Sequence, residues 1–123
     1  MAKAIGFGGA FLRVGDPKAL YAWYEKHLGL KHDKGCFVFP AAEQQASTAV
    51  SFFKTGDAYW PVTQPAMLNF QVDDLDAVLD ALIAAGIEVD AKRETYEFGR
   101  FGWFVDPEGN RVELWQPASV KAL

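Results

Sequence analysis

Three side chains near the end of the sequence have the types needed for binding or acid–base chemistry: Arg111, Glu113 and Trp115. They alternate with aliphatic residues, and successive side chains of a β-strand point to opposite faces of the sheet. A strand here would therefore place a guanidinium, a carboxylate and an indole on one face and two core side chains on the other. In a cleft, such a carboxylate could act as an acid or base, or accept a hydrogen bond from a ligand.

A turn signal places this strand in a hairpin. The sequence DPEGN at residues 106–110 separates it from the apolar run at residues 101–105. Proline presets φ for the turn, and glycine permits the positive φ that closes it. We therefore predict two strands, residues 101–105 and 111–115. Alternation does not decide which side of the first strand shares the face of Glu113, so the face of Trp103 stays open.

The other polar candidates each have two interpretations. Glu113 could be a cleft acid or base, but an ion pair with Arg13 or Arg111 is favoured. The two arginines could instead clamp a carboxylate or phosphate on a ligand. Asn69 and Gln71 share one face of a predicted strand, where their amides would either recognise a polar ligand group or bond to neighbouring strands.

Composition narrows the class of protein. A chain of 123 residues fits one domain. Its residues are 50% hydrophobic and 15% aromatic, and this composition argues against disorder. A net charge of −4 without a basic stripe argues against binding to nucleic acid. No apolar stretch approaches the ~20 residues of a membrane span. With Cys36 as the single cysteine and no apolar N-terminal segment, we expect a cytoplasmic protein.

Hydrophobic periodicity predicts the same order of elements twice. In each half a strand leads into a helix that begins at aspartate and ends at glycine, and strand-like segments follow. The predicted helices run from Asp16 to Gly29 and from Asp74 to Gly86. The predicted strands are residues 5–14, 30–39, 48–54, 67–72 and 87–90; residues 58–65 are expected to be an edge or a connection, and residues 92–99 a charged connection.

The repeated order indicates an internal duplication. Val14 corresponds to Val72 and Gly29 to Gly86, a shift of about 57 or 58 residues. The predicted fold is α+β: one domain over residues 1–123, made of two βαβββ modules at about 5–60 and 66–117. Their curved, partly open mixed sheets would surround a cleft, with the helices outside.

Several motifs resemble those of a known family. They are LRV at residues 12–14, HLGL at 27–30, FQVDD at 70–74 and DPEGNRVEL at 106–114. Together they resemble the vicinal oxygen chelate superfamily, which includes glyoxalase I, extradiol dioxygenases, fosfomycin resistance enzymes and bleomycin resistance proteins. The resemblance covers nearly the whole chain and implies the fold described above, but the superfamily hosts many reactions.

The resemblance also implies where a metal would bind. Enzymes of this superfamily usually hold a divalent metal with four side chains of the cleft, and these positions fall on Gly9, about Phe52, Met67 and Glu113. Only Glu113 keeps a ligand type, whereas a transition metal needs about three imidazole, carboxylate or thiolate ligands. We therefore expect no metal and no cofactor.

These considerations predict a small-molecule binding protein of the glyoxalase or bleomycin resistance type, which holds its ligand in an aromatic-lined cleft. The expected partners are a ligand with an aromatic or apolar part and a second copy of the chain in a homodimer. One alternative is an enzyme, a lyase, isomerase or dioxygenase, that uses Glu113 as acid or base or has a non-standard metal site. Another is a structural or regulatory dimer without ligand. The candidate ligand-binding residues are Phe11, Arg13, Phe52, Trp60, Met67, Asn69, Gln71, Trp103, Arg111, Glu113 and Trp115.

Overall fold

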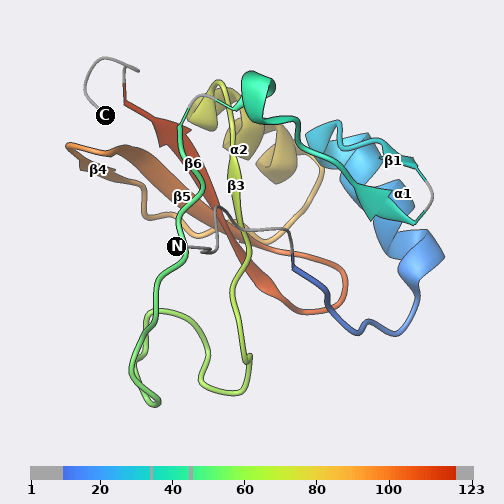
Figure 1. Ribbon diagram of the computed structural model, residues 1–123, viewed down its shortest axis with the longest axis horizontal. Helices are drawn as coiled ribbons and strands as arrows, with labels where there is room; N and C mark the ends of the chain where they lie inside the picture. The colour runs from blue at the N-terminus through green and yellow to red at the C-terminus, as the bar shows by residue number, and fades with distance from the viewer. Residues whose placement is uncertain (1–9, 34, 45, 119–123) are drawn as a thin grey trace, which may run out of the picture.

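The computed structural model describes residues 10–33, 35–44 and 46–118. Within these residues two α-helices accompany short and long strands (Figure 1). In chain order the elements are α1 (Pro17–Leu28), β1 (His32–Asp33), β2 (Cys36–Phe37), the short 3-10 helix η1 (Ala41–Glu43), β3 (Asn69–Gln71), α2 (Leu75–Ala84), β4 (Glu94–Tyr96), β5 (Gly99–Val105) and β6 (Arg111–Pro117).

The main sheet is built from the second half of the chain. Its strand order is β3-β6-β5-β4, with β3 parallel to β6 and the other neighbours antiparallel. In the first half, β1 and β2 pair with each other in a separate two-stranded ladder. The sheets are therefore mixed and open, as predicted for this α+β fold.

Both helices begin and end where the sequence predicts. The carboxylates of Asp16 and Asp74 accept hydrogen bonds of 3.1 Å from the backbone N–H groups of Ala19 and Ala77, which caps α1 and α2. At the other end of α1, Gly29 has φ 69°, the left-handed conformation that ends a helix.

The core lies between the helices and one face of the main sheet. Side chains of α2 and α1 pack there against alternate residues of β5 and β6. Its buried members are Tyr24, Leu75, Leu79, Leu82, Phe104, Val112 and Leu114. Gly102 allows α2 to come close to β5, because a Cβ at this position would lie 2.4 Å from Cδ1 of Leu79.

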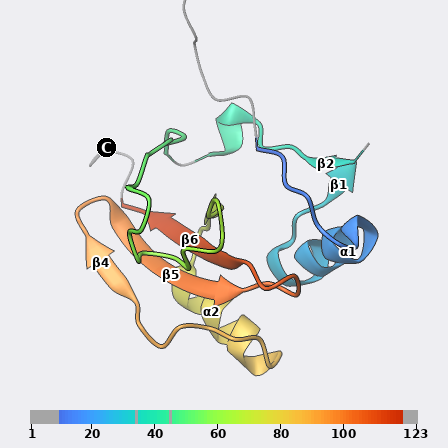
Figure 2. The ribbon, with the colours of Figure 1, turned by 90° about the horizontal axis from the view of Figure 1, so that it is seen from below.

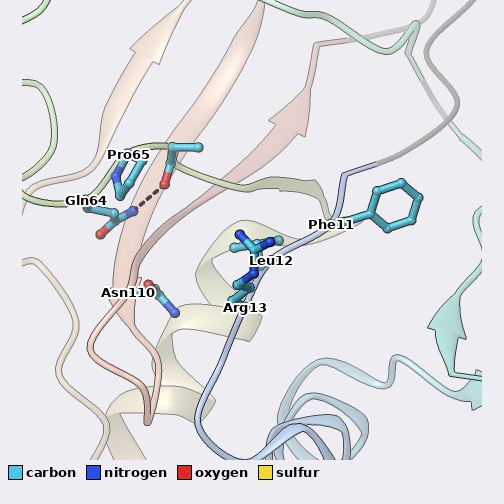
Figure 3. Close-up of a pocket in the computed structure, with 7 residues that line it drawn as sticks. Phe11, Leu12, Arg13, Gln64, Pro65 and Asn110 are labelled. Carbon is cyan, nitrogen blue, oxygen red and sulfur yellow. Dashed lines mark hydrogen bonds between the residues drawn. The ribbon is translucent and has the colours of Figure 1, made fainter.

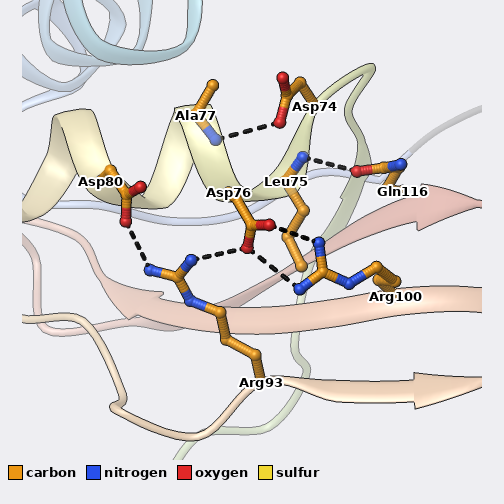
Figure 4. Close-up of polar contacts among 8 residues, drawn as sticks. All are labelled: Asp74, Leu75, Asp76, Ala77, Asp80, Arg93, Arg100 and Gln116. Atoms are coloured by element: carbon orange, nitrogen blue, oxygen red, sulfur yellow. Dashed lines mark hydrogen bonds and ion pairs between the residues drawn. The ribbon is translucent and has the colours of Figure 1, made fainter.

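Ion pairs fasten the outer side of α2 to the sheet (Figure 4). Asp76 accepts from Arg93 and from Arg100 at 2.7 Å, and Asp80 accepts from Arg93 at 2.8 Å. Hydrogen bonds from Arg100 and Arg93 hold the pKa of Asp76 at about 2, below its usual range. The helix position therefore depends on charge as well as on core packing.

The opposite face of the main sheet is covered by a connecting segment. Residues 46–66, drawn in green, cross this face while α2 lies on the other side (Figure 2). The segment contains turns but no helix or strand. Candidate site residues on this face are thus separated from the helices by the sheet.

Several predicted strands differ from the structure. The α+β class with outer helices is confirmed. Of the predicted strand 5–14, residues 10–14 form no strand and residues 5–9 lie outside the described part of the chain. Residues 48–54 form no strand either, and the predicted strand 30–39 is reduced to β1 and β2. Residues 87–90 contribute only one bridge, Val89 to Phe104, whereas the predicted connection 92–99 contains β4. Alternation identifies a strand-like sequence, but a strand also needs a neighbour that completes its hydrogen bonds.

No helix in the described part of the chain is long and apolar enough to cross a membrane.

Candidate functional site

The hairpin β5–β6 places Glu113 on the face opposite the helices. Val112 and Leu114 are buried in the core, so Glu113 between them points to the other side. Trp103 lies directly opposite Glu113 in the antiparallel register, and Asn69 lies opposite it on the parallel neighbour β3. The register therefore answers the question left open by the sequence: Trp103 shares the face of Glu113.

The turn of this hairpin also joins the two halves of the chain. Asp106 accepts from the backbone N–H groups of Glu108 and Asn110, each at 2.9 Å, and from the hydroxyl of Tyr24 at 3.0 Å. Glu108 in turn accepts from the backbone N–H groups of residues 15 and 16, at the start of α1. The turn thus orients the hairpin relative to the first half.

Four side chains form a hydrogen-bonded group that we call the Glu113 cluster: Tyr59, Asn69, Trp103 and Glu113. The Glu113 carboxylate accepts from the Tyr59 hydroxyl at 2.5 Å, from Asn69 Nδ2 at 2.6 Å and from Trp103 Nε1 at 2.9 Å. Glu113 is 8% exposed and Trp103 is 2% exposed. Burial, followed by the hydrogen bond to Glu113, raises the pKa of Tyr59, so its phenol remains a donor.

The expected ion pair of Glu113 with an arginine is wrong. Arg111 instead pairs with Asp90 at 2.8 Å, and its guanidinium lies 5.5 Å from the ring centroid of Trp103. The hydrogen bond from Arg111 is the main cause that lowers the pKa of Asp90. Arg13 is exposed and forms no ion pair with another described residue. The buried carboxylate is therefore held by neutral donors.

A hollow of about 590 Å³ lies next to the start of β6. Residues 11–13 form one wall, and residues 64–66 with Asn110 form the other. In Figure 3, Leu12 and Arg13 lie across from Gln64 and Asn110, whereas the ring of Phe11 points away from them. Gln64 fixes its own wall, because its side chain accepts from the N–H of Arg111 at 2.8 Å and donates to the carbonyl of Arg111 at 2.9 Å.

Comparison with known proteins identifies the family. The sequence profile of the Glyoxalase/Bleomycin resistance protein/Dioxygenase superfamily matches residues 6–114. The chain belongs to this superfamily. No curated protein matched the chain.

Solved structures with the same fold include one with a stated ligand class. TnmS3, an antibiotic binding protein from Streptomyces sp. CB03234, is 26% identical with a TM-score of 0.58, over 95% of this chain and 100% of that one. A protein of unknown function from Agrobacterium tumefaciens str. C58 is 22% identical with a TM-score of 0.60, over 95% and 98% of the two chains. A superfamily member from Sphaerobacter thermophilus DSM 20745 is 21% identical with a TM-score of 0.53, over 87% and 93%.

The side chains at the superfamily's metal positions do not fit a divalent-metal site. Around Glu113 the structure places N–H and O–H donors, which occupy the carboxylate oxygens that a metal would need. Met67 is half-buried and Phe52 is 97% exposed, and Gly9 lies outside the described residues. Among the described residues, no three His, Cys, Asp or Glu side chains form a group that could hold an ion.

Of the remaining candidates, Trp60 contacts the cluster through Tyr59, whereas Gln71 and Trp115 contact other parts of the chain. Trp60 packs against the rings of Phe53 and Tyr59 and donates to the carbonyl of Gln64 at 2.9 Å. Gln71 binds the backbone of Ala46, so its amide connects β3 to the covering segment. Trp115 stacks on Phe101 at 6.0 Å and donates to the carbonyl of Phe98.

Two residues of the site were missed by sequence reasoning. Tyr59 and Gln64 lie in the connecting segment, where no periodicity assigns a side chain to a face. Two adjacent aromatic residues, Tyr59 and Trp60, in an otherwise exposed segment were the available signal. Such a pair is unusual in a solvent-facing loop and points to contact with an apolar surface.

Proposed function

We propose that this protein binds a small organic molecule with an aromatic or apolar part, without a transition metal. The ligand would lie between the Glu113-bearing face of the β3-β6-β5-β4 sheet and the segments at residues 10–14 and 46–66. The observation that carries the proposal is the combination on that face of indole and phenyl rings with one fixed carboxylate. Apolar walls with a few oriented polar groups are typical of small-molecule sites.

The size and lining of the hollow support this proposal. Its volume of about 590 Å³ lies within the range of known ligand pockets. Leu12 supplies an apolar wall, and Arg13 supplies a positive charge that could pair with an acidic group of the ligand. The similarity to TnmS3, an antibiotic binding protein, supports a ligand of the antibiotic class.

We include a homodimer in the proposal. Phe11 is 99% exposed, Phe52 97% and Val38 69%. All three belong to the first half, where β1 and β2 pair only with each other within the described residues. Burial of apolar surface is the main driving force for association. A second copy that covers this half would complete the cleft, as the resemblance to dimeric bleomycin resistance proteins implies.

The free, exposed thiol of Cys36 is consistent with a cytoplasmic location.

A ligand screen tests the proposal. The purified protein is heated with each member of a panel of aromatic antibiotics, and its metal content is measured in parallel. A ligand at about 100 times its Kd should stabilise the protein by about 2.7 kcal/mol, which raises the Tm by several degrees. Stabilisation without bound transition metal would support the proposal; about one equivalent of tightly bound transition metal would contradict it.

A further inference from the structure

The Glu113 cluster suggests which chemical group the ligand presents. We propose that Tyr59 occupies the place of the ligand between the sheet and the covering segment, and that the ligand carries an aryl hydroxyl that replaces the Tyr59 hydroxyl on Glu113. This inference rests on the proposed function and narrows its ligand class to phenolic compounds. It depends on three features of the cluster: how its donors are held, what surrounds Tyr59, and which ligands the carboxylate would reject.

The donors of the cluster differ in how firmly they are held. Asn69 and Trp103 lie on β3 and β5, directly opposite Glu113, and backbone hydrogen bonds fix these strands to β6. Tyr59 comes from a segment without helix or strand and is 38% exposed. The sheet therefore keeps the carboxylate oriented through two donors, while the third donor can leave without unfolding a strand.

The surroundings of Tyr59 fit a flat ring. Phe53 stacks on Tyr59 with centroids 5.6 Å apart and planes at 20°, and Trp103 meets it edge to face at 6.0 Å and 83°. Trp60 adds a second edge contact at 6.3 Å. Another aromatic ring could make the same contacts, which are worth more than the buried area alone.

The carboxylate determines which ring substituent is accepted. The Glu113 carboxylate accepts from every donor of the cluster, so a ring hydroxyl could replace the Tyr59 hydroxyl, whereas an ether on the same ring has no proton to donate. No cation pairs with Glu113 within the described residues, since Arg111 pairs with Asp90. An acidic group placed there would meet an uncompensated like charge. A neutral phenol satisfies both conditions, as Tyr59 does.

A matched pair of probes tests the inference. Umbelliferone carries a phenolic hydroxyl, and its O-methyl ether has the same rings without the donor. Both are titrated by fluorescence at mildly acidic pH, where umbelliferone keeps its proton, into the full chain and into Tyr59→Phe. Tyr96→Phe serves as the control, since it removes a tyrosine hydroxyl at an exposed position on β4.

We expect umbelliferone to bind at least about tenfold more tightly than its ether, the usual effect of a hydrogen bond to a charged acceptor. Tyr59→Phe should tighten binding of both probes by a similar factor, because neither must then displace the Tyr59 hydroxyl. Tyr96→Phe should change neither affinity.

Equal affinity for the two probes, or no effect of Tyr59→Phe, would overturn the inference and leave ligand binding elsewhere in the cleft intact. Absence of binding by both probes would also overturn it. The proposed function would fail separately, if the antibiotic screen found no ligand.

Discussion

Glu113 and Trp103 lie directly opposite each other on β6 and β5, and the Trp103 indole donates to the Glu113 carboxylate over 2.9 Å. This pair sits on the sheet face that does not contact α2. In the superfamily, the position of Glu113 commonly supplies a metal ligand. Here the same carboxylate, itself buried, accepts hydrogen bonds from three neutral donors, of which Trp103 is buried while Asn69 and Tyr59 are exposed.

Glu113→Gln should lower stability. A glutamine offers one acceptor oxygen, and its NH₂ group would face a donor of Asn69, Trp103 or Tyr59. We expect a loss of about 1–3 kcal/mol in the free energy of unfolding, measured by urea denaturation. Glu97→Gln, at an exposed position, is the control and should stay within about 0.5 kcal/mol. An unchanged midpoint for Glu113→Gln would show that the hydrogen bonds to this carboxylate do not stabilise the fold.

Gly102→Ala should also destabilise the fold, by a different cause. The added methyl would lie 2.4 Å from Cδ1 of Leu79, so α2 must move away from β5. Overpacking of this kind costs about 1–3 kcal/mol. Shortening the neighbour in the double variant Gly102→Ala/Leu79→Ala should make the glycine substitution less costly than it is alone. If the two effects simply added, the close approach of α2 would be refuted.

Stability should fall in acid partly through Asp76. Its pKa is lowered from 3.8 to about 2 by hydrogen bonds from Arg100 and Arg93. A lowered folded-state pKa contributes stability that is present above the unfolded pKa and is lost as the pH falls through the folded value. Between pH 3.8 and about pH 2, the free energy of unfolding should therefore fall less steeply with decreasing pH for Asp76→Asn than for the unmodified chain. Asp73→Asn is the control; identical slopes for all three proteins would exclude the contribution of Asp76.

The proposed homodimer predicts different effects for two exposed apolar residues. Phe52 is 97% exposed in the first half, and Val62 is 70% exposed in a turn of the covering segment. Phe52→Ser should shift light-scattering mass toward the monomer at low concentration, because it removes apolar area from the interface. Val62→Ser should not. A monomer at all concentrations for the unmodified chain would contradict the dimer.

The sequence was sufficient for the elements that carry local signals. The closing hairpin follows from its DPEGN turn, and both helices follow from their aspartate caps and glycine ends. The face of Trp103 could not be predicted, because it depends on register across two strands. Tyr59 could not be predicted either, since a loop side chain that bonds to a strand 54 positions away leaves no periodic pattern.

The strands of the first half could not be predicted correctly from the sequence pattern alone. Residues 48–54 are rich in apolar and β-branched side chains, as a strand often is, yet the described chain pairs no strand with them. Their sequence encodes a tendency, and pairing decides whether it is realised. The predicted ion pair between Glu113 and an arginine was wrong for a related reason. Arg111 pairs with Asp90 instead, and Asp90 is brought near β6 by the isolated bridge between Val89 and Phe104. The sequence pattern did not predict that bridge.

Indole N–H signals in two-dimensional NMR test the central claim most directly. The four tryptophans give distinct reporters: Trp103 lies in the Glu113 cluster, whereas Trp23 packs against Phe104 on the helix side. Each signal is assigned with a Trp→Phe variant, and the chain is titrated with an antibiotic from the screen and with umbelliferone. The account predicts a saturable shift of the Trp103 signal with little change at Trp23. A saturable shift at Trp23 with Trp103 unchanged would contradict it.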